Sequence, residues 1–151
     1  MKFLRNIFFV LLLSAFAACA GEGAAKQEPQ VLGASPSEVA VTLYSGLTSG
    51  DVKAVTENIY FTNAIDSNVF RDYFEMAVAS SDYKKRTEGF KAQYKAVSET
   101  INGEDAVVAL EGMGPLGNYL KINVKLRLID GYWKVDGHHG VYHTDFSKGK
   151  K

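Results

Sequence analysis

Three histidines lie close together near the C-terminal end of the chain. His138, His139 and His143 have Asp136 and Asp145 as near neighbours in the sequence. Because imidazole nitrogens and carboxylate oxygens are common ligands of Zn²⁺ and Cu²⁺, one interpretation of this segment is a metal site. The alternative is a polar strand end whose histidines face water, since the neighbouring glycines disfavour a helix that would align His139 with His143.

A set of aromatic side chains is the second candidate site. Each member combines a ring with a hydroxyl or indole N–H group, a combination that suits the walls of an amphipathic pocket. The set comprises Tyr44, Tyr60, Tyr73, Tyr94 and Trp133. One hypothesis is that several of these rings line a ligand pocket, and the alternative is that they pack in an ordinary core.

No spacing of residues identifies a catalytic group. The sequence contains no glycine-rich phosphate loop, no serine nucleophile elbow and no HExxH motif. We therefore assign no catalytic residue, expect no cofactor and favour a domain that is not an enzyme. A small enzyme of the isomerase, dehydratase or hydrolase type is the alternative, and it would require a carboxylate whose pKa is raised by burial.

The N-terminal residues are typical of a signal peptide. Lys2 and Arg5 precede the apolar run 7–13. The apolar segment is about ten residues long, whereas a helix needs about twenty to cross a bilayer. The single cysteine, Cys19, follows two alanines, and a lone thiol in an exported protein requires an explanation.

Residues 16–19, Phe-Ala-Ala-Cys, resemble the bacterial lipobox, whose cysteine is lipidated before the leader is cleaved; Phe16 departs from the usual leucine. The resemblance implies that residues 1–18 are removed and that Cys19 carries acyl chains, of which two or more hold a protein stably on a membrane. Ala20, in place of an aspartate, resembles the sorting signal for the outer membrane. The resemblance therefore implies a lipid-anchored protein of the bacterial cell envelope, at the periplasmic face of the outer membrane.

Beyond the lipobox the chain divides into a tether and one domain. Residues 19–34 are mostly small and polar and are predicted to form a flexible tether. Residues 35–146 are numerous enough to bury one core, and they contain no internal repeat. Residues 147–151 are predicted to be a basic tail.

The first half of the domain predicts three helices. Ser35 and Glu38 are spaced as a capping box, and a proline stands at the first helical position. The apolar residues of 36–49 recur at helical spacing. Asp51 is expected to cap a second helix, and residues 68–79 have the pattern of a third.

The second half predicts strands. Residues 120–128 alternate between apolar and polar types without interruption, which is typical of a half-buried strand. The dipeptides Asn102-Gly103 and Asp130-Gly131 favour tight hairpins, and a wider loop is expected at 112–117. These signals predict a four-stranded antiparallel meander. The chain is therefore assigned to the α+β class, with three N-terminal helices packed on the sheet.

The two ends of the domain resemble the nuclear transport factor 2-like superfamily. Residues 35–51 are similar to its entry, a helix followed by a small residue, Gly, Asp and a second helix; residues 130–135, Asp-Gly-Tyr-Trp-Lys-Val, are similar to its closing hairpin. More narrowly, the chain resembles short bacterial lipoproteins with an uncharacterised domain of this superfamily, related to a lumazine-binding group. The resemblance covers most of 35–137 and implies a cone-shaped, cystatin-like fold with a curved sheet over an apolar pocket. It transfers no catalytic residue and no ligand.

The charges are balanced in total but separated along the chain. The 151 residues include 17 basic and 17 acidic side chains, which argues against a general nucleic-acid binder. Residues 19–82 carry a net charge of −6 and residues 83–151 a net charge of +4. The alternation places on one outer sheet face Lys121, Asn123, Lys125, Arg127 and Lys134. Such a face would attract anionic lipid headgroups or envelope polymers, and the alternative is a solvated face that keeps the protein soluble.

These patterns predict a membrane-anchored envelope lipoprotein whose domain binds a small apolar or amphipathic ligand, or an envelope partner, without catalysis. The first alternative is the small enzyme with a buried carboxylate. The second is an interaction module that forms a homodimer through its sheet, which would require an exposed apolar patch of several hundred Å².

Overall fold

The computed structural model describes residues 29–138 and 144–145 of the chain. Its elements, in chain order, are α1 (Pro36–Ser49), α2 (Val52–Asn58), β1 (Ile59–Tyr60), α3 (Ala64–Ala79), α4 (Ser81–Thr87), β2 (Gln93–Asn102), β3 (Asp105–Met113), β4 (Tyr119–Ile129), β5 (Tyr132–Asp136) and β6 (Thr144–Asp145). The helices precede the long strands, as predicted, so the α+β class is confirmed.

Helix α1 begins and ends where its sequence signals predict. The Ser35 hydroxyl accepts from the Glu38 backbone N–H at 3.3 Å, and the Glu38 carboxylate accepts from the Ser35 backbone N–H at 2.8 Å, which completes the capping box. Gly50 ends the helix in the left-handed conformation, with φ of 75°. The apolar face of α1, including Val39 and Leu43, is buried against the sheet.

The helices differ from the prediction at one boundary and by one additional helix. Helix α3 begins at Ala64, before the expected residue 68, since the Asn63 side chain accepts from the Asp66 backbone N–H at 2.8 Å. Helix α4 was not predicted, because its short polar sequence has no apolar periodicity. It begins at a Ser80 cap.

The four predicted strands form the central meander of a larger sheet. The strand order is β1-β5-β4-β3-β2, and β2 to β5 pair antiparallel in sequence. Two short strands extend the predicted sheet, because β1 pairs parallel with β5 and β6 pairs with β4. Strand β2, at the edge, contains a bulge between Ala96 and Ser98.

Both predicted hairpins form, with one shift. Asp130 and Gly131 both have positive φ, as a type I′ turn requires. In the other hairpin the turn residues are Gly103 and Glu104, one position later than the predicted dipeptide, because Asn102 still pairs in β2. Gly112 was expected in the wide loop but lies within β3, opposite Tyr94 in register.

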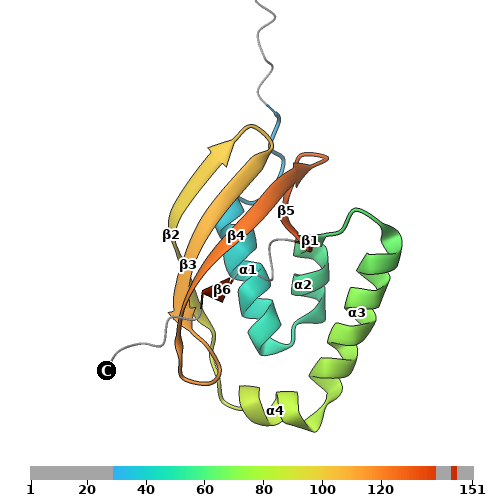
Figure 1. Cartoon of the computed structure of the whole chain (residues 1–151), viewed down its shortest axis with the longest axis vertical. Coiled ribbons are helices and arrows are strands. Elements are labelled where there is room, and N and C mark those ends of the chain that lie inside the picture. Colours follow the sequence, from blue (N-terminus) through green and yellow to red (C-terminus); the bar gives the residue numbers. More distant parts are fainter. Residues whose placement is uncertain (1–28, 139–143, 146–151) are drawn as a thin grey trace, which may run out of the picture.

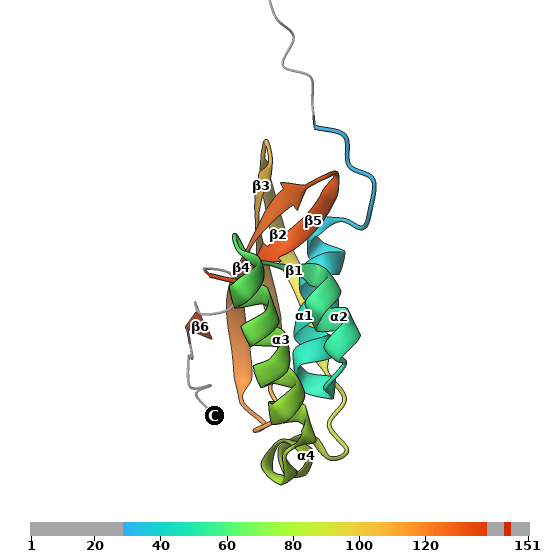
Figure 2. The ribbon, with the colours of Figure 1, turned by 90° about the vertical axis from the view of Figure 1, so that its right-hand side faces the viewer.

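Helices and sheet form two layers around one core (Figures 1 and 2). Alternate residues of β3, β4 and β5 point toward α1 and are buried, and the other residues form what we call the outer face of the sheet. The largest fully buried side chains are Leu43, Val55, Val108, Leu110, Val124 and Val135. The predicted alternation of β4 is therefore confirmed residue by residue.

The last residues of the predicted tether contact the domain. The Leu32 backbone N–H donates to the Gly131 carbonyl at 2.8 Å, and Gly33 lies against the Tyr132 ring. The chain thus enters the domain beside the β4–β5 turn, and Figure 1 shows α4 at the opposite end. Within 29–138 and 144–145, no helix combines the length and the hydropathy that a bilayer span requires.

Candidate functional site

The outer face of the sheet carries most of the charged side chains that the sequence singled out. Strand register aligns Lys95, Glu111 and Lys121 in one row across β2, β3 and β4. A second row, nearer the β4–β5 turn, contains Asp105, Arg127 and Lys134. The predicted position of the basic side chains on this face is confirmed, but acidic side chains alternate with them.

Glu111 neutralises one of these cations. Its carboxylate accepts from the Tyr119 hydroxyl at 2.5 Å and lies 3.1 Å from the Lys121 ammonium. The Tyr119 hydrogen bond, together with Lys121, lowers the pKa of Glu111 below its ordinary value. Lys121 is therefore held in a local ion pair.

The second row is also paired. The Arg127 Nε donates to the Asp105 carboxylate at 2.9 Å, and this contact raises the pKa of the guanidinium. The Lys134 ammonium donates to the backbone carbonyl of Glu57, which ties β5 to the end of α2. Both cations therefore have partners within the domain.

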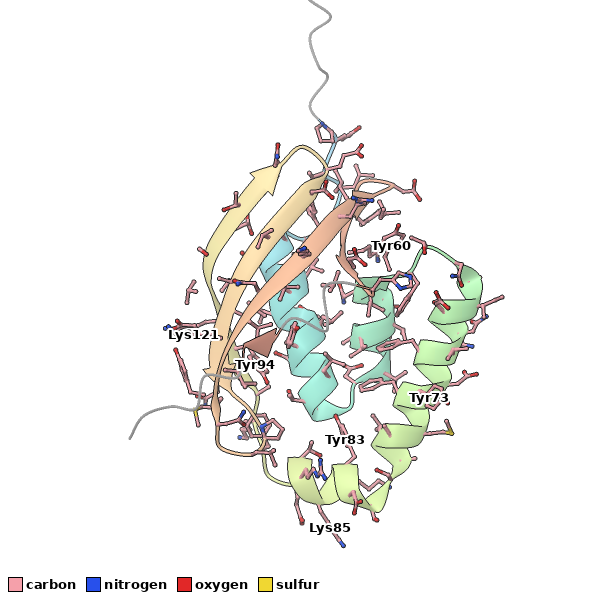
Figure 3. All side chains as sticks on the ribbon, in the orientation of Figure 1. Tyr60, Tyr73, Tyr83, Lys85, Tyr94 and Lys121 are labelled. Carbon is pink, nitrogen blue, oxygen red and sulfur yellow. The ribbon has the colours of Figure 1, made fainter. Side chains whose placement is uncertain are left out.

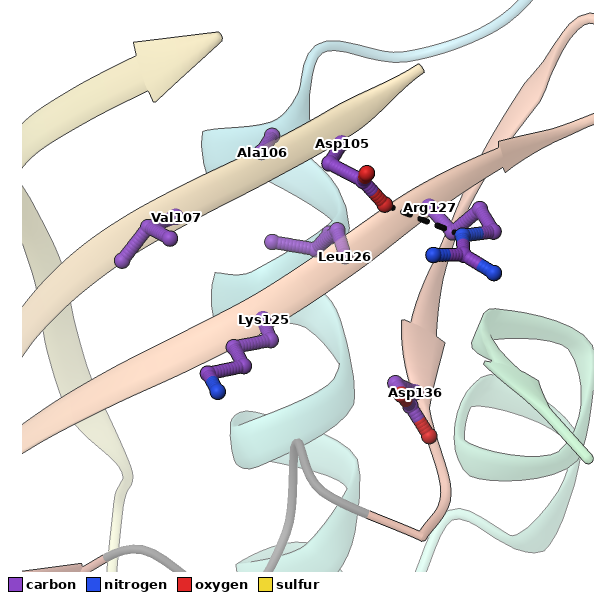
Figure 4. Close-up of a pocket in the computed structure, with 7 residues that line it drawn as sticks. All are labelled: Asp105, Ala106, Val107, Lys125, Leu126, Arg127 and Asp136. Atoms are coloured by element: carbon purple, nitrogen blue, oxygen red, sulfur yellow. Dashed lines mark hydrogen bonds and ion pairs between the residues drawn. The ribbon is translucent and has the colours of Figure 1, made fainter. Parts of the chain in front are cut away.

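Lys125 lies between these rows, in a hollow of the outer face (Figure 4). The hollow measures about 310 Å³ and is lined by Asp105, Ala106, Val107, Lys125, Leu126, Arg127 and Asp136. Val107 is 43% exposed and adjoins Lys125 in register, so an apolar surface lies beside the ammonium group. Among the described residues, no carboxylate forms an ion pair with Lys125.

His138 is placed at the junction of β5 and α3. Its Nε2 lies 3.2 Å from the Thr62 hydroxyl and 3.5 Å from the Asp66 carboxylate, and its backbone N–H donates to Asp136. The ring meets Phe61 edge to face. No group of three metal ligands occurs among the described residues, and His139 and His143 lie outside them, so the proposed three-histidine metal site is not tested.

The aromatic candidates lie in three different places. Tyr44 and Tyr94 are buried between α1 and the sheet, in edge-to-face contact with ring centroids 5.9 Å apart, and Trp133 is buried in the same core. Tyr60 is half-buried on β1, next to Asp136 in register.

Tyr73 points to solvent from α3 and is 67% exposed (Figure 3). The structure therefore brings three of the five aromatic candidates together, as packed core residues. Their role in ligand binding stays a prediction.

Burial favours the protonated form of the two phenols. Burial raises the pKa of Tyr44 to about 12, with a further contribution from Tyr94, and burial also raises the pKa of Tyr94. Both hydroxyls are therefore protonated at neutral pH.

The enzyme alternative and the homodimer alternative each require a feature that can be checked among the described residues. No aspartate or glutamate among them is buried, so residues 29–138 do not supply the carboxylate that the enzyme alternative needs. The homodimer alternative requires exposed apolar side chains, and the outer face has them at Val107, Met113, Tyr119 and Tyr132. Met113 and Tyr119 are direct partners across β3 and β4, whereas Val107 and Tyr132 lie apart from them.

The sequence patterns missed the acidic part of the hollow. Asp105 and Asp136 come from two different strands, and only the register across β3, β4 and β5 brings them beside Lys125. The alternation of β3 would have placed Asp105 on the outer face, but it does not reveal which cations the carboxylate meets.

Comparison with solved structures identifies the fold. A protein named as a proposed NTF2-like transpeptidase, from Campylobacter jejuni, superposes with a TM-score of 0.54 and 23% identity, over 68% of this chain and 98% of that one. The chain has a nuclear transport factor 2-like fold. An NTF-2-like protein of unknown function from Silicibacter pomeroyi aligns with a TM-score of 0.43 and 19% identity, over 65% and 85% of the two chains.

The nuclear transport factor 2-like fold confirms the helices packed on a sheet that the resemblance implied, and it carries no activity with it. The apolar pocket that the resemblance also implied stays a prediction. No family model and no curated protein matches the chain. Cys19, the leader and the basic tail 147–151 lie outside the described residues.

Proposed function

We propose that this protein is a lipid-anchored component of the bacterial envelope, and that the hollow around Lys125 binds a small amphipathic ligand with an anionic group. The observation that carries the ligand site is the exposed Lys125, without an ion pair among the described residues, beside the apolar Val107. The sequence 16–19 and the apolar leader support the anchor.

The surroundings of Lys125 define the chemistry of the ligand. An anionic group would replace water around the ammonium, while an alkyl or aromatic part would cover Val107. Asp105 and Asp136 at the rim repel ligands with several negative charges. A hollow of about 310 Å³ is at the lower end of small-molecule sites, so the ligand is small.

The anchor is tested by replacing the cysteine. We expect Cys19→Ala to remain unprocessed or to leave the membrane fraction, because no thioether-linked lipid can form. Labelling with radioactive palmitate and flotation of the membranes measure both effects. Palmitate that stays on the Cys19→Ala chain would contradict the proposal.

The ligand site is tested with hexyl phosphate as the probe, below its micellar concentration, followed by NMR shifts. Lys125→Gln is expected to weaken binding about fivefold, since it removes the cation and keeps most of the stem. Lys53→Gln, at an exposed cation of α2 that does not line the hollow, is the matched control and is expected to leave the affinity unchanged. Equal effects of the two substitutions would reject the hollow as the site.

A homodimer formed through the sheet is the second candidate. The exposed Val107, Met113, Tyr119 and Tyr132 on the outer face favour it. It predicts a concentration-dependent increase in mass in sedimentation experiments, and a Tyr132→Lys substitution would abolish that increase. A dimer of this kind would cover the hollow and compete with hexyl phosphate.

A further inference from the structure

A segment at the end of the domain opposite the tether is rich in basic side chains. Residues 81–95, which include α4 and the start of β2, contain five basic and two acidic side chains. We call this segment the basic end. Its cations are Lys84, Lys85, Arg86, Lys91 and Lys95, all exposed. Among the described residues, none of the five forms an ion pair, in contrast to the paired Lys121 and Arg127 of the outer face.

The basic end is fixed to the core. The Tyr83 hydroxyl donates to the Leu47 carbonyl at 2.7 Å, so α4 is attached to the C-terminal end of α1. The Tyr83 ring also approaches Gly50, where a Cβ atom would meet it. The cations are thus held at a defined place, at the bottom of Figure 3, where Lys85 is labelled.

The tether enters at the other end of α1, which is acidic. The side chains that give this end its charge are Glu38, Glu99, Glu104 and Asp130, while the charge of Asp105 is balanced by Arg127. Glu99 accepts from the backbone N–H of Ser37 at 2.8 Å, and Asp130 adjoins the Gly131 carbonyl that binds Leu32. The domain is therefore polarised along its length, with negative charge at the tether.

At its coil length, the tether is shorter than the domain and favours an orientation with the basic end away from its own membrane. From Cys19 to Leu32 the chain spans about 45 Å when fully stretched and about 20 Å as a coil. Strand β4 alone is about 33 Å long, and α4 lies beyond it. A lipid anchor would therefore hold the acidic end near the membrane and direct the basic end away from it.

We infer that the basic end binds a linear anionic polymer of the envelope, one with repeating carboxylate or phosphate groups, that lies beyond the membrane holding the anchor. This inference rests on the proposed anchor for its orientation and on the five exposed cations for its chemistry. Several cations at one end of a domain bind a long polyanion more tightly than a single small anion, because each contact raises the local concentration for the next.

The test uses the full lipidated chain in phosphatidylcholine vesicles, with fluorescent polygalacturonate and polyphosphate as the two probes. We expect the vesicles to recruit at least one polymer, with an affinity that falls as salt rises. The double variant Lys84→Gln with Lys85→Gln is expected to weaken recruitment about tenfold. The matched control, Lys53→Gln with Arg71→Gln, makes the same change in net charge on α2 and α3 and is expected to have less than a twofold effect.

The two probes distinguish carboxylate from phosphate as the anionic group that is bound. Flotation with the vesicles tests the anchor separately from the binding of polymer. A chain that floats with the vesicles but recruits neither polymer overturns the inference and leaves the anchor standing. A chain that does not float overturns the anchor, and polymer binding by the same protein in detergent then decides the role of the basic end. Equal losses of polymer recruitment in the two double variants also overturn the inference. So does tighter binding of the Cys19→Ala chain to phosphatidylglycerol vesicles than to either polymer.

Discussion

At the scale of single residues, the outer face is defined by which cations have partners. Glu111 holds Lys121 and Asp105 holds Arg127, so these side chains contribute little to binding an external anion. Lys125 differs, because the side chain beside it on β3 is the apolar Val107. A strand of alternating charge thus presents one available ammonium group in place of a uniform basic surface.

The two faces of β4 predict opposite effects for adjacent substitutions. Val124 is fully buried, so Val124→Asp would place an unpaired charge in the core and cost about 3 to 5 kcal/mol of unfolding free energy. Lys125→Asp changes an exposed position and is expected to cost less than about 1 kcal/mol. Urea unfolding measures both, and similar losses would show that the two faces are assigned wrongly.

Tyr44 predicts a loss of stability at alkaline pH. An unfolded tyrosine titrates near pH 10, whereas burial raises the pKa of Tyr44 to about 12. Between these values only the unfolded chain has lost the proton, so the stability present below pH 10 falls as the pH rises toward 12, by about 2 to 3 kcal/mol. Urea midpoints between pH 9 and 12 measure this loss, and Tyr44→Phe is expected to reduce its slope. An absorbance titration with every tyrosine ionising near pH 10 would contradict it.

At the scale of elements, Gly112 controls how β2 and β3 pack. It faces inward opposite Tyr94, and a Cβ atom built there would lie 2.6 Å from both the Gln93 carbonyl oxygen and the Tyr94 ring. The missing side chain provides the space in which Tyr94 meets Tyr44. A glycine that weakens strand propensity is therefore required by the packing.

We expect Gly112→Ala to lower the unfolding free energy by about 1 to 3 kcal/mol, because the new methyl group collides with backbone as well as with a ring. Thermal unfolding followed by circular dichroism measures the change. Ala109→Ser, on the outward side of the same strand, is the control and is expected to change little. Equal stability of Gly112→Ala and the native chain would mean that β2 lies further away than described.

The elements with local signals could be predicted from the sequence, and those that depend on distant contacts could not. The Ser35 cap, the alternation of β4 and the Asp130-Gly131 turn are all encoded within a few residues. Helix α4 depends on Tyr83 reaching Leu47, and β1 depends on pairing with β5, more than 70 residues later. The hollow was missed for the same reason, since three strands contribute to it.

At the scale of the whole molecule, the contact at Leu32 determines where the tether ends. The hydrogen bond to Gly131 holds the chain against the β4–β5 turn, so the predicted tether ends at Leu32 and not at residue 34. A lipid anchor at Cys19 would therefore hold the domain closer to a membrane than a tether of residues 19–34 would allow.

Leu32→Pro is expected to lengthen the accessible segment, because proline has no N–H group to donate to Gly131. Limited proteolysis with mass spectrometry measures the boundary. The native chain is expected to be cut before Leu32, and the variant up to Ser35. Leu32→Ala keeps the N–H group and is the control, and identical fragments from all three proteins would show that this contact does not protect the tether.

The bulge in β2 has a consequence for copies that share a membrane. Lipid anchors would confine the chains to a plane, where neighbouring domains meet often, and an exposed strand of ten residues is a template for sheet-to-sheet polymerisation. The irregular pairing between Ala96 and Ser98 interrupts the row of backbone donors and acceptors, and Lys95 adds a charge beside it. The domain can therefore be crowded on a surface without its open edge seeding fibres.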